Sequence, residues 1–134
     1  MRAKSLVLIA AICLAVAGRA VVAHHSFAAE FDANKPFKMT GTVTKVEWMN
    51  PHTFFYTDVV DEKTKQKANW GMEMGSPNIL MRNGWTRNTM KVGDVVNVEG
   101  SLAKDGSNTG NARSVVLAKT GQRLFAGSSQ GNTP

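Results

Sequence analysis

Lys67 to Asn83 reads KANWGMEMGSPNILMRN, and its hydrophobic pattern changes from that of a strand to that of a helix. In the first half every second residue is apolar, which predicts a strand over Lys67–Met74. Ser76 is then a typical helix N-cap, because its hydroxyl can accept from a backbone N–H and a proline follows at the first helical position. Gly84 follows directly and is placed to end a helix, so the sequence predicts one short helix over Pro77–Asn83.

Four further segments are predicted to be strands, because they are rich in β-branched residues or alternate apolar with polar residues. These segments are Phe37–Trp48, His52–Val60, Val92–Ala103 and Ala112–Ala118. In the first of them the apolar residues change face partway along, which predicts a bulge or bend near Thr44. Gln122–Phe125 is expected to add a short extension after the last strand.

The order of elements is therefore three strands, one helix and two strands. This order favours an all-β domain, a five-stranded OB-like barrel over residues 37–127, and another small barrel or a half-open sheet is the alternative. Residues 24–36 are expected to form an arm with Phe27 and Phe31 as docking points, and Ala28–Glu30 has room for a helical turn. Residues 128–134 are polar and small, and we expect a disordered tail there.

The first 23 residues have the features of a secretory signal peptide. A basic start, MRAK, precedes the apolar run Ser5–Ala17, which is too short to span a membrane as a helix. Small residues permit cleavage after Ala17 or after Ala23, and the second site lies at the better distance from the apolar run. The sequence thus predicts a periplasmic or secreted protein, and an uncleaved helix is the alternative.

The net charge and the cysteine content limit the kinds of partner and anchor that we expect. The net charge falls from +6 to +3 when Arg2, Lys4 and Arg19 leave with the leader, so a nucleic-acid surface is not expected. The single cysteine, Cys13, lies in the leader and follows the bulky Ile12, which does not fit a lipoprotein cleavage site. The mature chain is therefore expected to have no thiol, no disulfide and no membrane anchor.

Four motifs in the mature chain resemble those of a family of small exported proteobacterial proteins of unknown function. They are HHSFAAEFD (His24–Asp32), GTVTKVEWMNPH (Gly41–His52), SPNILMRNGW (Ser76–Trp85) and KVGDVVNVEG (Lys91–Gly100). The resemblance covers nearly all of the mature chain. It implies export and an OB-like fold, and it supplies neither an activity nor functional residues.

The predicted mature amino terminus has the chemistry of a copper ligand. Cleavage after Ala23 makes His24 the first residue, so its α-amine and its imidazole can chelate the same ion, as in the histidine brace of copper proteins. His52 is the expected further ligand, with His25 as the alternative, and imidazole suits Cu(II). The competing interpretation is a flexible arm, or histidines that are hydrogen-bonded at the barrel rim.

The predicted third strand suggests a softer metal site. Trp70, Met72 and Met74 share one face, and thioethers prefer Cu(I) or Ag(I) while an indole can cap a cation. The alternative is that these side chains simply fill the barrel core.

A third hypothesis concerns aromatic residues near the predicted second strand. The aromatic set consists of Trp48, His52, Phe54, Tyr56 and Trp85. OB barrels bind ligands on their second and third strands, and aromatic rings there can stack on a sugar, a peptide or a quinone-like molecule. The alternative is that these rings complete the core.

The chain contains no HExxH, P-loop or dinucleotide motif. We therefore expect a non-enzymatic binding module that uses the face of the second and third strands and the arm. Copper handling by His24 and His52, with Met72 and Met74 as further candidates, is the alternative function.

Overall fold

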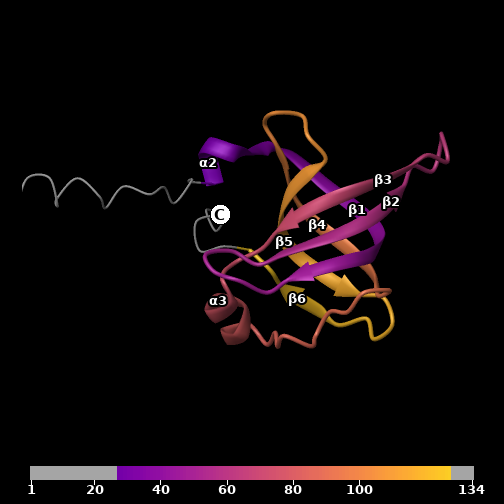
Figure 1. Ribbon diagram of the computed structural model, residues 1–134. Coiled ribbons are helices and arrows are strands. Elements are labelled where there is room, and N and C mark those ends of the chain that lie inside the picture. The colour runs from indigo at the N-terminus through magenta and orange to yellow at the C-terminus, as the bar shows by residue number, and fades with distance from the viewer. Residues whose placement is uncertain (1–26, 128–134) are drawn as a thin grey trace, which may run out of the picture.

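The computed structural model describes residues 27–127, which form two short helices and six strands (Figure 1). The elements are α2 (Phe27–Glu30), β1 (Phe31–Glu47), β2 (Phe54–Val60), β3 (Lys67–Glu73), α3 (Pro77–Arg82), β4 (Val95–Ala103), β5 (Thr109–Leu117) and β6 (Arg123–Phe125). Within this range no helix is both long and apolar enough to cross a membrane.

The strands close into a ring. Their order in the sheet is β3-β2-β1-β4-β5-β6, and β3 also pairs with β5. That last pairing is parallel, whereas the other pairings are antiparallel. Strands β1 to β5 thus form a closed five-stranded barrel with α3 between β3 and β4, and β6 extends the sheet beside β5. The predicted all-β, OB-like fold class is confirmed.

β1 bends around the barrel and pairs with two neighbours. The predicted bulge is present, because the register of β1 against β2 shifts between Val43 and Lys45. β1 also begins earlier than expected, so residues 31–36 of the predicted arm are strand rather than irregular chain. Phe31 pairs with Ala103 of β4, and an irregularity in that pairing between Phe31 and Pro36 accommodates the proline.

α3 follows the predicted capping pattern. Ser76 Oγ accepts a hydrogen bond from the Ile79 backbone N–H at 3.4 Å, and the helix ends before Gly84, whose φ is +89°. Leu80 of α3 is fully buried, and Trp85 after it donates its indole N–H to the Phe125 carbonyl at 2.7 Å. Helix α3 and the loop after it therefore pack against one end of the barrel.

Besides β1, three strands start at positions other than those expected. β2 begins at Phe54 instead of His52, and β5 begins at Thr109, ahead of Ala112. β4 begins only at Val95, because the preceding residues form a turn in which Asp94 Oδ2 accepts from the Lys91 backbone N–H.

A buried carboxylate on the outer face of the barrel

Glu73 breaks the usual relation between side-chain direction and burial. Its neighbours Met72 and Met74 face the barrel interior and are 0% and 1% exposed. Because side chains alternate along a strand, Glu73 lies on the outer face of the wall. It is nevertheless only 7% exposed. An acidic side chain is rarely buried without partners, so its surroundings indicate what the site can do.

The strand register brings two polar partners to this carboxylate. Glu73 is paired with Phe54 of β2 on one side and with Asn111 of β5 on the other. His52 precedes Phe54 by two residues, and its Nδ1 lies 3.0 Å from Glu73 Oε1. Asn111 Nδ2 donates to the same oxygen at 3.3 Å. Three segments that are far apart in sequence therefore meet at one carboxylate oxygen.

This arrangement selects one tautomer of the imidazole. When Glu73 is ionised its oxygens can only accept, so Oε1 accepts from the Asn111 amide and from His52 alike. The proton of the neutral His52 ring then lies on Nδ1, and Nε2 carries the lone pair. A carboxylate that holds an imidazole in this way is the usual partner of a metal-binding histidine.

Burial also changes the acidity of the site. It raises the pKa of Glu73 to about 7, and the negative charge of Glu30 adds to the rise. Glu30 ends α2, which is held by two bonds from Lys104: the backbone N–H donates to the Glu30 carbonyl at 2.9 Å and Nζ donates to the Ala28 carbonyl at 2.6 Å. Helix α2 therefore carries a second carboxylate whose charge acts on Glu73.

A crevice of about 320 Å³ lies between α2 and the β4–β5 loop. It is lined by Ala29, Glu30, Phe31, Ala103, Lys104, Asp105, Ser107 and Thr109. Phe31 is buried and stacks on Phe27 with 5.8 Å between the ring centroids, so both predicted docking residues lie at this end of the molecule.

The outer face continues from His52 along β2. Tyr56 is half-buried and pairs in register with Gly71 of β3. The Tyr56 hydroxyl donates to Glu47 Oε2 at 3.1 Å, and Lys45 Nζ lies 5.3 Å from the ring centroid. Burial raises the pKa of Tyr56, so its hydroxyl stays a donor at neutral pH.

The structure divides the predicted aromatic set. His52, Phe54 and Tyr56 share the outer face of β2, and each is half-buried. Trp85 is 2% exposed and belongs to the core, and the half-buried Trp48 packs against that core. Trp85 is therefore not part of an accessible face, because it helps to close the barrel at the α3 end.

The predicted metal ligands are also separated. Met72 and Met74 lie in the core, whereas His52 is on the outer face, so the structure does not bring the thioethers and the imidazole together. His24 and His25 lie outside the described residues. Within residues 27–127 no three His, Cys, Asp or Glu side chains are grouped as a metal site.

Sequence reasoning missed Glu73 and Asn111 as partners of His52. One signal was available in the sequence: Glu73 stands between two methionines. The structure adds that its strand is paired on both sides at this residue. Asn111 carries no local signal, because only the parallel pairing of β3 with β5 brings it to the carboxylate.

A model of a family of unknown function (DUF6152) matches residues 10–113. The chain belongs to this family. Neither the curated proteins nor the solved structures contain a match. The family assigns no activity, so the function has to be argued from the site itself.

Proposed function

We propose that this chain is an exported binding protein that holds a copper(II) ion with His52 and the mature amino terminus, His24. The observation that carries the proposal is the His52 Nδ1 contact to the buried Glu73 carboxylate at 3.0 Å. This contact fixes the ring and places on Nε2 the lone pair that a metal would use.

The proposal requires the amino terminus to reach this site from the start of α2. His24 precedes Phe27, the first residue of α2, by three residues, and three extended residues span about 10 Å. The negative charge of Glu30, at the other end of α2, contributes to the raised pKa of Glu73. An α-amine and an imidazole from His24 would complete a set of nitrogen ligands with His52.

The donor chemistry favours Cu(II). Imidazole and amine nitrogens suit this ion, and Cu(II) has the highest affinity among the common divalent metals. Met72 and Met74 are buried in the core, so the thioethers that would favour Cu(I) are not at the surface near His52. The half-buried Phe54 and Tyr56 extend the same face along β2, which keeps the site within the predicted binding surface.

The first test is the amino terminus of the exported protein. We expect intact mass analysis of the periplasmic fraction to show a chain that begins at His24. Any other start removes the α-amine from the site and contradicts the proposal.

The second test is a Cu(II) titration of this mature chain against a competing chelator, followed by electron paramagnetic resonance. We expect affinity tighter than micromolar and hyperfine coupling to several nitrogens. His52→Ala, or one extra residue before His24, should weaken binding by at least 100-fold, and His25→Ala decides whether the second histidine takes part. Asn69→Ala, on the exposed part of β3, is the matched control and should bind like the parent.

Glu73→Gln tests the positioning role of the carboxylate. The amide keeps the size of the side chain but accepts more weakly, so we expect a 10- to 100-fold loss of Cu(II) affinity with the same number of nitrogen ligands. Unchanged affinity in Glu73→Gln would show that the contact with His52 serves packing alone.

A further inference from the structure

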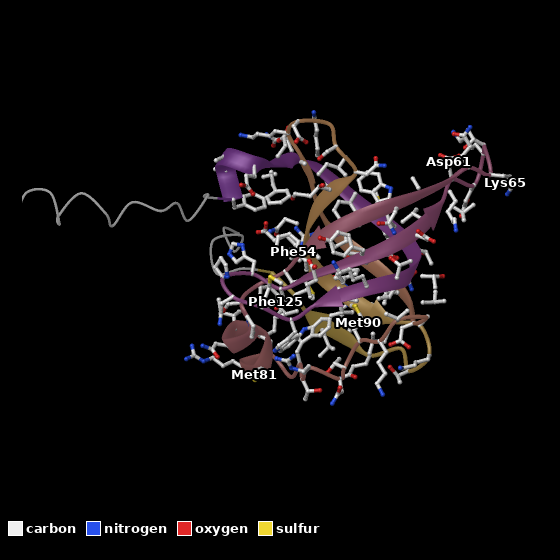
Figure 2. The ribbon with its side chains drawn as sticks, in the orientation of Figure 1. Phe54, Asp61, Lys65, Met81, Met90 and Phe125 are labelled. Atoms are coloured by element: carbon white, nitrogen blue, oxygen red, sulfur yellow. The ribbon has the colours of Figure 1, made fainter. Side chains whose placement is uncertain are left out.

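The end of the β2–β3 pair furthest from α3 is less well sealed than the rest of the barrel. Its inward-facing residues Val59, Ala68 and Trp70 are only half-buried, whereas Phe55 and Met72, nearer to α3, are fully buried. Figure 2 shows this end, where Asp61 and Lys65 mark the turn that joins the two strands, well away from Met81 on α3.

A gap in the wall exposes this end. β5 pairs with β3 only from Gly71 to Glu73, so among the described residues Lys67–Trp70 has β2 as its only neighbouring strand. The Gly71 N–H donates to the Asn108 carbonyl at 3.0 Å, and the opening begins beyond this bond.

The opening is a cleft of about 460 Å³, within the range of small-molecule sites. Four apolar residues from three strands and four polar residues from two loops line it. They are Met39, Val59, Ala68 and Trp70, with Asp61, Thr64, Gln66 and Asn108. Barrel mouths with an apolar floor and a few polar groups are frequent ligand sites.

A buried hydroxyl next to this cleft lacks a partner. Thr57 is 0% exposed, pairs in register with Trp70, and lies one inward position deeper than Val59. Its Oγ1 lies beneath the lining residues and beside Gly41, and within residues 27–127 it has no hydrogen-bond partner. The same holds for Thr53 Oγ1, which is outside the cleft. Buried hydroxyls are normally paired, so the Thr57 hydroxyl is a bonding partner for a polar group that enters the cleft deeply enough to reach it.

We propose that this mouth is a second binding site, which takes a small uncharged aromatic molecule with one hydroxyl or carbonyl group. The indole of Trp70 and the thioether of Met39 suit an aromatic ring, and the Thr57 hydroxyl suits its polar group. No basic side chain lines the cleft among the described residues. The carboxylate of Asp61 is already bonded to the Lys63 and Thr64 backbone N–H groups, so a charged ligand would find little compensation.

This site is independent of the copper proposal, because it shares no residue with the His52 cluster and lies at the other end of β2 and β3. The probes are 1-naphthol and 1-methylnaphthalene, which have nearly the same shape and differ by a hydroxyl in place of a methyl group. Each is titrated into the metal-free mature chain while the indole N–H signal of Trp70 is followed by NMR.

We expect both probes to shift the Trp70 signal, with 1-naphthol bound about 10-fold more tightly. Thr57→Val should abolish that preference, whereas Thr42→Val, at an exposed position of β1, should retain it. Ala68→Phe should fill the cleft and weaken both probes at least 10-fold, with circular dichroism confirming that the barrel is intact. Equal affinity for the two probes, or no shift of Trp70 with either, would overturn the proposal.

Discussion

At the two ends of the β2–β3 pair the same alternation of side chains leads to opposite patterns of burial. Near α3 the outward-facing Glu73 is buried, and at the far end the inward-facing Trp70 is half-exposed. Alternation decides which side of the wall a residue occupies, but burial depends on what covers that side. At the α3 end a carboxylate, an imidazole and an amide meet on the outer face, whereas the far end has only a short turn.

The largest expected effect compares Met72 with Trp70, which are neighbours on the inward face of β3. Met72→Ala should lower the free energy of unfolding by about 2–5 kcal/mol, because it leaves a cavity in a closed core. Trp70→Ala should cost less than about 2 kcal/mol although the tryptophan is larger, because its site is already open to water. Urea unfolding of both variants measures the difference.

An equal or greater cost for Trp70→Ala would break this comparison. It would show that the far end is as tightly packed as the layer next to α3. Val115→Ala, fully buried on β5, serves as a reference for the closed core.

The next effect is the pH dependence of stability that arises from the buried carboxyl of Glu73. The pKa of Glu73 is about 7 in the folded chain and near 4.5 when unfolded. Between these two values the folded chain keeps a proton on Glu73 that the unfolded chain releases. The contribution of this proton to the free energy of unfolding is fully present below pH 4.5 and is lost as the pH rises through about 7. The loss should be about 1–3 kcal/mol, measured on the metal-free chain by urea unfolding between pH 5 and pH 8.

Glu73→Gln provides the control for this prediction, since its amide does not titrate and the slope between pH 5 and pH 8 should flatten. Other carboxylates act at lower pH: hydrogen bonding to Lys119 lowers the pKa of Asp94, so its contribution is lost only in more acidic solution. A slope that is identical in the parent chain and in Glu73→Gln would contradict the assignment to this group.

The smallest effect concerns the unpartnered hydroxyl inside the barrel. Thr57→Val keeps the shape of the side chain and removes an unsatisfied polar atom, so unfolding should become more costly by about 1 kcal/mol. Differential scanning calorimetry in the absence of any ligand measures the rise in Tm. A clear loss of stability would mean that the hydroxyl is already hydrogen-bonded and would weaken the argument for the open mouth.

Local sequence signals predicted most of the elements. The Ser76 cap and the glycine after α3 have mechanisms that depend only on nearby residues, and both operate as expected. The bulge in β1 was visible as a change of face along Phe37–Trp48. The start of β1 was not predicted, because Asp32, Asn34 and Pro36 suggest irregular chain until β4 supplies a partner.

The candidate site was only half predicted. His52 was selected for its imidazole, and its position on the same face as Phe54 and Tyr56 followed from strand alternation. Glu73 was not assigned to a site, because the sequence does not reveal that β5 comes to lie beside β3 at that residue. Trp85, Met72 and Met74 were candidates on chemical grounds, and their burial depends on the closure of the barrel.

The sequence by itself determined the period of each strand, the position of the helix and the order of elements that makes an OB-like barrel, since these follow from neighbours a few residues apart. Only the tertiary structure decided that Glu73 is sheltered, that Asn111 and His52 share its oxygen, and that Trp70 is left half-exposed. The physical reason is that burial and acidity depend on distant segments brought together by ring closure, and no local pattern records which segments those are.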